Sequence, residues 1–184
     1  MNYELPKGSY SKGLRVLSFD PGTVNMGVSC VELRNGRLHV LCSAVLNYPI
    51  HDIPLLSQQR LDFINEVQAW IKTFNPKGIV AERFQSRGLR GSTVECVSMM
   101  LGMLSMLNLP FYFITASTWK NAYQRRFAID LKDIYQEINV VPHILDSALI
   151  GCYGIEQGTH RQISFTIDSI IDDVESVSLI GYTK

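Results

Sequence analysis

Residues 14–33 read LRVLSFDPGTVNMGVSCVEL, and this stretch decides the fold. Its first seven residues are mostly apolar and predict a buried strand that ends on Asp20. The Pro21-Gly22 turn breaks the strand directly after this acid, so we expect the Asp20 side chain to emerge at the edge of a sheet. Gly27 has no side chain, so the returning strand can approach a neighbouring element closely. An acid before a Pro-Gly turn more often caps the turn than performs chemistry, so its interpretation depends on the rest of the chain.

The remaining sequence predicts an α/β protein built on one mixed sheet. Asn35-Gly36 is a strong hairpin signal between a second strand, 25–34, and a third strand, 37–48. Further strands are predicted over 78–84 and 110–116, and helices over 55–74 and 92–108, near 119–123 and 131–138, and from 142 onward. An antiparallel meander followed by two helix-connected parallel strands is typical of a five-stranded ribonuclease-H-like sheet flanked by helices.

Acidic residues stand at positions where this fold would bring them together. Glu82 ends the strand GIVAE in the same sense that Asp20 ends the first strand, and parallel neighbours would bring the two acids to one edge. His143 and Asp146 are spaced i, i+3 in PHILDSALIGCYG and therefore share one helix face. Such a cluster repels itself unless cations neutralise it, and its oxygen ligands suit Mg²⁺ or Mn²⁺. Two such ions can hydrolyse a phosphodiester.

Three motifs carry a resemblance to a known family. FDPGTVNMG (19–27), IVAERF (79–84) and PHILDSALIG (142–151) resemble, in order and spacing, the motifs of the RuvC family of Holliday junction resolvases. The resemblance covers residues 14–154, and the short chain is similar to the phage-encoded branch. It implies a crossover junction endodeoxyribonuclease: a metal-dependent, structure-selective endonuclease that resolves four-way (Holliday) and other branched DNA.

The resemblance also implies the catalytic site. It assigns the binding of two divalent ions, Mg²⁺ or Mn²⁺, to four residues: Asp20, Glu82, His143 and Asp146. Many members have a second aspartate where this chain has His143. Imidazole suits Mn²⁺ better than Mg²⁺ and could instead move a proton, and His143 could also simply begin the helix, so the role of His143 stays open.

Basic and aromatic residues near the acids are candidate DNA contacts. The family places an aromatic residue shortly after the glutamate, which makes Phe84 a candidate for stacking at an opened junction, although one residue off the usual position. Phe84 could equally plug the core at the strand end. Arg83, Arg87 and Arg90 lie around it on a Gly-punctuated loop and are predicted to contact phosphates. A second basic cluster is either solvated or a further phosphate contact, and it comprises Lys120, Arg125 and Arg126.

A nearly uncharged helix around Val97–Leu109 is the candidate dimer interface. The segment TVECVSMMLGMLSMLNL has four methionines and no charge after Glu95, which is more apolar surface than one sheet face can cover. We therefore expect one face to pack on the sheet and another to pack on a second copy. The family resemblance implies a twofold homodimer, which matches two cuts at a four-way junction.

Length and charge predict one domain with two flanking segments. The 184 residues suit a single core, divided into an N-terminal arm (1–13), a nuclease domain (14–158) and a C-terminal extension (159–184) that could be a strand plus a helix packed on or beside the domain. The formal net charge is zero, but the charge is segregated. Residues 77–126 hold seven basic and two acidic side chains, whereas the tail is acidic, so DNA is expected on the basic segment.

The cysteines and the apolar segments predict a cytoplasmic protein, in the host cytoplasm if it is phage-encoded. Four scattered cysteines without a CxxC pair or a secretory signal indicate reduced core thiols. The uncharged run after Cys96 is interrupted by Pro110 and continues as the β-prone FYFIT, so a helix and a strand are favoured over a membrane span.

Two other functions fit parts of the sequence. A catalytically silent DNA-binding or assembly subunit could keep the same fold, although all four candidate ligands are present. The turn DPGTVNMG also resembles a phosphate-binding turn of actin-like ATPases. That fold needs a duplicated domain of about twice this length, and no second glycine-rich copy occurs in the sequence.

Overall fold

A mixed five-stranded sheet forms the centre of the computed structural model, which describes residues 13–22, 25–48, 56–84, 91–138 and 140–181. The strands are β1 (Leu14–Asp20), β2 (Met26–Arg34), β3 (Arg37–Leu46), β4 (Gly78–Glu82) and β5 (Phe111–Ile114). Their order is β3-β2-β1-β4-β5. β1, β2 and β3 form an antiparallel meander, and β4 and β5 join β1 in parallel. The sheet predicted from the sequence is therefore confirmed.

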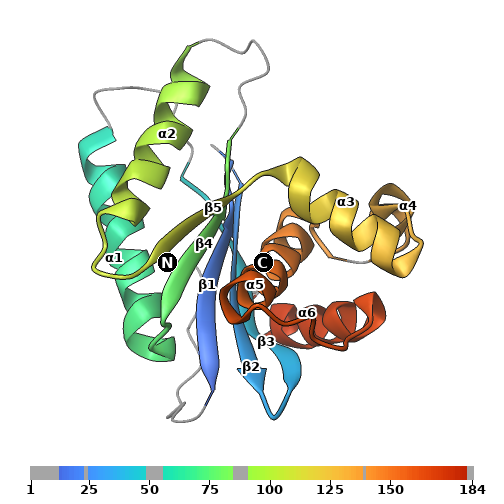
Figure 1. Cartoon of the computed structure of the whole chain (residues 1–184). Helices are drawn as coiled ribbons and strands as arrows, with labels where there is room; N and C mark the ends of the chain where they lie inside the picture. The colour runs from blue at the N-terminus through green and yellow to red at the C-terminus, as the bar shows by residue number, and fades with distance from the viewer. Residues whose placement is uncertain (1–12, 23–24, 49–55, 85–90, 139, 182–184) are drawn as a thin grey trace.

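Helices cover both faces of the sheet (Figure 1). α1 (Leu56–Phe74) and α2 (Ser92–Ser105) lie on one face. On the other side of the sheet lie α3 (Ala116–Phe127), α4 (Leu131–Glu137), α5 (Pro142–Thr159) and α6 (Ile167–Gly181). The two crossovers through α1 and α2 supply the helical connections that parallel strands require.

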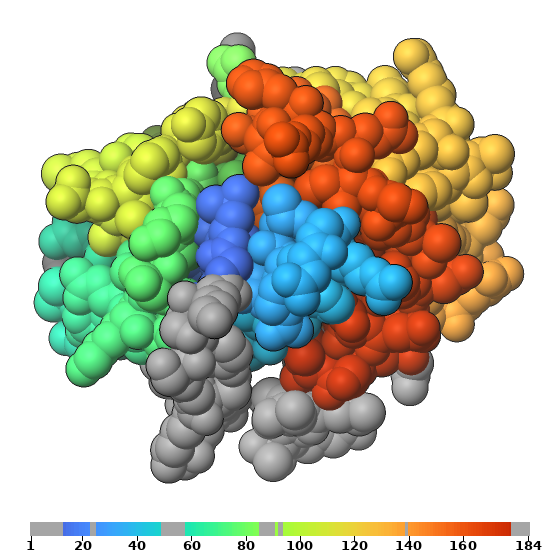
Figure 2. All heavy atoms as spheres, turned by 60° about the horizontal axis from the view of Figure 1, so that its bottom comes forward, coloured from blue at the N-terminus to red at the C-terminus, as the bar shows by residue number. Residues whose placement is uncertain are grey.

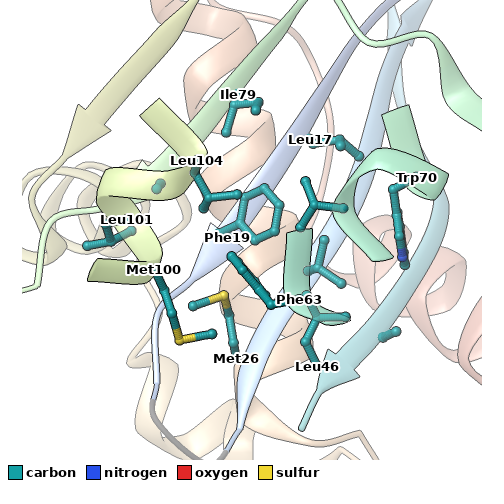
Figure 3. Close-up of a cluster of buried hydrophobic side chains, with 14 of the residues drawn as sticks. Leu17, Phe19, Met26, Leu46, Phe63, Trp70, Ile79, Met100, Leu101 and Leu104 are labelled. Atoms are coloured by element: carbon teal, nitrogen blue, oxygen red, sulfur yellow. The ribbon is translucent and has the colours of Figure 1, made fainter. Parts of the chain in front are cut away.

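Two hydrophobic cores form because strand residues alternate between the two faces. On one face, Phe19 of β1 belongs to a core that also contains Phe63 and Trp70 of α1 and Met100 of α2 (Figure 3). Val16, which comes three residues before Phe19 in β1, points to the other face and belongs to the core under α5 and α6. Burial on both faces explains why apolar side chains occur on both faces of β1.

The N-terminal half of α5 lies very close to the meander. A Cβ atom added at Gly27 of β2 would lie 1.9 Å from the backbone oxygen of His143, at the start of α5. Buried hydroxyls add hydrogen bonds nearby, because Ser29 Oγ lies 2.6 Å from Ser147 Oγ and 2.8 Å from Ser43 Oγ. These contacts fix the first turns of α5 beside the end of β1, whose Asp20 pairs with Gly27.

The C-terminal extension belongs to the second core. Its buried side chains are Ile163, Ile167, Ile170 and Val174. α6 packs against β3, where Asp173 Oδ2 accepts a hydrogen bond from the backbone N–H of Val40 at 3.0 Å. Atoms of α6 lie against the β2–β3 hairpin in Figure 2. Residues 161–166, all described, form no strand, so the helix of the extension is observed and its possible strand is not.

The outward face of α2 differs from the expectation of a large apolar surface. Its inner face packs on the sheet through buried residues that include Val97, Met100 and Leu104. The exposed positions are small or polar, namely Glu95, Ser98, Gly102 and Ser105. Met103 is partly buried against the core, whereas Met106 is 86% exposed directly after the helix end. Much of the methionine surface counted from the sequence is thus already covered within one chain.

The positions of the cysteines and the lengths of the helices match what the sequence predicts. Cys30, Cys42, Cys96 and Cys152 are all buried thiols. Over the residues that the structure describes, every helix is too short or too polar to cross a bilayer.

Replacing Gly27 with alanine tests the close approach of α5. We expect Gly27→Ala to lower the free energy of unfolding by about 1–3 kcal/mol, because the new methyl group meets backbone atoms of His143. Gly102→Ala is the control, since a Cβ there meets nothing within 4 Å. In an exposed helix position this change should stabilise the protein by about 0.5–1 kcal/mol. Equal unfolding midpoints for the two variants in urea would contradict the described packing.

Candidate active site

Asp20 and Glu82 lie side by side because of the sheet register. Phe19 pairs with Ala81 in the parallel β1–β4 ladder, so the two acids are the next residues on adjacent strands. Asp20 is buried and Glu82 is partly buried. The structure therefore places both strand-end acids at one edge of the sheet, as the sequence predicts.

α5 brings His143 and Asp146 to the same edge. Pro142 occupies the first turn of α5, where a missing N–H costs little. His143 Nδ1 lies 2.5 Å from Asp20 Oδ2, and Asp146 lies one turn further along the helix, with its side chain 10% exposed. All four predicted site residues thus gather where β1, β4 and α5 meet.

α3 and α4 contribute three further side chains that contact the carboxylates. Trp119 Nε1 donates a hydrogen bond to Glu82 Oε2 at 2.9 Å. Lys120 Nζ forms an ion pair with Asp146 Oδ2 at 2.8 Å, and the Tyr135 hydroxyl donates a short hydrogen bond to Asp146 Oδ1. Both oxygens of Asp146 are therefore bound by protein groups.

Sequence reasoning missed Trp119 and Tyr135. A signal for Trp119 existed, because α3 follows β5 directly and β5 is the parallel neighbour of β4, so the first turn of α3 lies near Glu82. Nothing in the pattern around Tyr135 distinguishes it from an ordinary helix residue, since its position depends on how α4 packs.

The pKa shifts show a site with excess negative charge. Burial is the main cause that raises the pKa of Glu82 and of Asp146, and nearby carboxylates raise both further. The Trp119 hydrogen bond and the Lys120 charge act in the opposite direction. The hydrogen bond with Asp20 raises the pKa of His143. The positive charge of Lys120 offsets part of the repulsion, and the contact with Asp20 favours the charged form of His143.

The donor set fits a divalent ion in ligand type. Three carboxylates and one imidazole are ligands for Mg²⁺ or Mn²⁺, and the raised pKa values of Glu82 and Asp146 indicate that a further cation would be stabilised. Across the described residues, however, no three such side chains already surround a common point. The reason is local, because His143 binds Asp20 and two donors bind Asp146. An ion would need these side chains to turn.

The first candidate DNA-contacting group is only partly described. Arg83 is exposed beside Glu82, and its backbone N–H donates to Ile114 O at 2.8 Å. Phe84 is partly buried and packs against the core under α1 and α2, which favours the plug over the stacking role. Arg87 and Arg90 lie outside the described residues.

The three residues of the second basic cluster, Lys120, Arg125 and Arg126, have different surroundings in the structure. Arg125 is exposed, whereas Arg126 Nη1 pairs with Glu156 Oε1 at 2.8 Å and its guanidinium lies 4.9 Å from the ring centre of Phe127. Arg126 therefore holds α3 to α5, and neither alternative from the sequence describes it. Lys120 faces Asp146 and not open solvent.

Comparisons with known proteins agree on the fold. No protein-family model matches the chain. A curated crossover junction endodeoxyribonuclease RuvC from Corynebacterium diphtheriae is 29% identical over 123 residues, covering 64% of this chain and 74% of the relative. The structure of Thermus thermophilus RuvC in complex with a Holliday junction substrate matches with a TM-score of 0.63 at 15% identity, covering 79% of this chain and 97% of that one. The yeast mitochondrial Holliday junction resolvase matches with a TM-score of 0.50 at 16% identity, covering 90% of this chain and 78% of the yeast chain.

The mixed sheet, its helices and the acidic edge together define a ribonuclease-H-like protein. Within that fold the chain is similar in sequence and in structure to RuvC proteins, the family that the motifs around Asp20, Glu82 and Asp146 resemble.

The His143–Asp20 pair predicts a shifted titration. In protein treated with a chelator, His143 should titrate above its usual pKa of about 6.5, because Asp20 stabilises the imidazolium. Since the folded pKa is raised, the pair stabilises the protein fully below about pH 6.5, and this contribution is lost as pH rises through the raised value. Asp20→Asn should lower the His143 pKa measured by NMR, whereas the exposed Asp172→Asn should not. A His143 pKa that is insensitive to Asp20→Asn would refute the pairing.

Proposed function

We propose that this chain is a divalent-metal-dependent endonuclease that cuts four-way and other branched DNA. The observation that carries the proposal is the convergence of Asp20, Glu82 and Asp146 at one edge of a RuvC-like sheet, with His143 beside them. Of two structural neighbours with the same fold, the yeast protein is a Holliday junction resolvase by name, and Thermus thermophilus RuvC was solved in complex with a Holliday junction substrate.

The side chains have distinct tasks in this proposal. Asp20, Glu82 and Asp146 hold two ions of Mg²⁺ or Mn²⁺. When bound, such ions activate water for attack on phosphorus and neutralise the departing oxygen. Trp119 orients Glu82 through one oxygen only, at Oε2. His143 uses Nδ1 to contact Asp20, so its Nε2 is the atom that binds an ion or moves a proton, and the side chain is 43% exposed.

Branched DNA would lie across the exposed basic side chains next to this edge. Arg83 lies at the rim of the site and Arg125 on the outer face of α3. We propose that both contact phosphates, together with Arg87 and Arg90, which lie outside the described residues. Phosphate contacts position the substrate without reading its sequence, which suits an enzyme that recognises branch structure.

A second function is favoured by one observation. Asp20, Glu82 and Asp146 already hold protein donors, which is also what a DNA-binding subunit without catalytic activity would show. The two functions differ in a direct assay, because such a subunit binds a junction but does not cut it.

Cleavage of a synthetic four-way junction distinguishes the endonuclease from the subunit without catalytic activity. The unmodified protein should cut it with Mn²⁺ or Mg²⁺ and not with EDTA. Asp146→Asn should reduce cutting at least about 100-fold, since bound metal supplies several kcal/mol of transition-state stabilisation. Junction binding should persist or tighten, because the change removes a negative charge near phosphate.

Asp172→Asn, an exposed carboxylate on α6, is the matched control and should cut normally. Near-normal cutting by Asp146→Asn would remove the assigned site. Binding by the unmodified protein without any cutting would favour the subunit without catalytic activity.

We further propose that two copies act together, since paired incisions across a junction need two sites related by a twofold axis. The interface is placed around Val97–Leu109, at the C-terminal end of α2, where Met106 is 86% exposed. The small outward residues of α2 would let a second copy approach closely.

Met106→Glu tests this interface better than a change at Met103, which packs against the core. We expect folded monomers that nick one strand, because a charge at a twofold contact meets its own copy. Leu61→Glu, an exposed apolar position on α1, is the control and should stay dimeric. Light scattering and a nicking assay provide the readouts. An unmodified protein that is monomeric at micromolar concentration would end the dimer proposal.

A further inference from the structure

We propose that Lys120 competes with divalent ions for Asp146, while Tyr135 positions the same carboxylate to bind them. The inference rests on the proposed metal site and adds how access to it is controlled. Neither side chain belongs to the strand ends or to α5, because Lys120 comes from α3 and Tyr135 from α4.

The Lys120–Asp146 pair is a directed contact and not a loose surface pair. The Lys120 side chain is 33% exposed and that of Asp146 10%, with a distance of 2.8 Å between Nζ and Oδ2. The ammonium also lies 4.9 Å from the ring centre of Trp119 and 5.9 Å from that of Tyr135. Two aromatic faces and one carboxylate thus hold this cation in place.

Lys120 and a metal ion cannot share Asp146 equally. A divalent ion bound to this carboxylate would lie within a few ångströms of the ammonium, where like charges repel strongly in a partly buried site. Binding of the ion therefore requires Lys120 to withdraw. Its long side chain can then turn toward solvent or toward a DNA phosphate, while the ion takes over the neutralisation of Asp146.

Tyr135 has the opposite effect because it is neutral. The phenolic hydroxyl of Tyr135 is a neutral donor, and it donates a hydrogen bond to Asp146 Oδ1. A carboxylate oxygen has more than one acceptor position, so this hydrogen bond can persist while the carboxylate binds an ion. Tyr135 is thus a positioning residue, and losing it frees Asp146 to rotate.

The two roles predict opposite changes in metal affinity. Direct measurement of Mn²⁺ binding to the DNA-free protein, by calorimetry or by the EPR signal of free Mn²⁺, should show about tenfold tighter binding for Lys120→Met, because a charged hydrogen bond no longer competes. Tyr135→Phe should bind Mn²⁺ about 10- to 100-fold more weakly. Lys132→Met on α4 is the control for a lost positive charge and should change nothing, since Lys132 is exposed.

A double variant tests whether Lys120 acts through Asp146. In an Asp146→Asn background, Lys120→Met should give no further gain in Mn²⁺ affinity, because the competing pair is already absent. A gain that persists would mean that Lys120 acts only as a general positive charge and would overturn the proposal. Thermal unfolding identifies a variant that fails to fold, in which case Lys120→Gln replaces Lys120→Met.

The same data separate this inference from the proposed function. If Asp146→Asn binds Mn²⁺ as tightly as the unmodified protein, the metal site itself is wrong. If Asp146→Asn weakens binding but Lys120→Met leaves it unchanged or weaker, the site stands and the competition is wrong. Tyr135→Phe with unchanged Mn²⁺ affinity would remove its positioning role.

Discussion

Repulsion between three buried or half-buried carboxylates is the constraint on which the site depends. Asp20 and Glu82 stand on adjacent strands, and Asp146 faces them from α5, so their negative charges raise the pKa values of Glu82 and Asp146 beyond the effect of burial. Such a cluster is stable only with positive partners. In this structure the partners are Lys120 and His143, and in the proposed enzyme they are divalent ions.

The scaffold holds these charges together by packing that does not itself involve charge. The β1–β4 register places two acids, and the glycine contact with the start of α5 places His143 against Asp20. Buried hydroxyls of Ser29 and Ser147 tie the same helix to the sheet. With the backbone held by this packing, the proposed withdrawal of Lys120 would change metal access without a change of fold.

The parts of the site that follow from local patterns could be predicted from the sequence. Strand ends determine Asp20 and Glu82, and helical spacing pairs His143 with Asp146. Parts that depend on partners distant in sequence could not. Arg126 was grouped with DNA-contacting residues because nothing local shows that it pairs with Glu156, 30 residues away. Tyr135 lacked any signal for the same reason. The count of methionines predicts an apolar outward face for α2, but Ser98, Gly102 and Ser105 recur at helical spacing and occupy that face.

The position of bound metal tests the central claim most directly. Anomalous diffraction from crystals of the unmodified protein loaded with Mn²⁺ should show density bounded by Asp20, Glu82 and Asp146, with His143 adjacent and Lys120 no longer on Asp146. Manganese density elsewhere on the molecule, or an edge that stays without density while Lys120 keeps its ion pair at high Mn²⁺ concentration, would contradict the account.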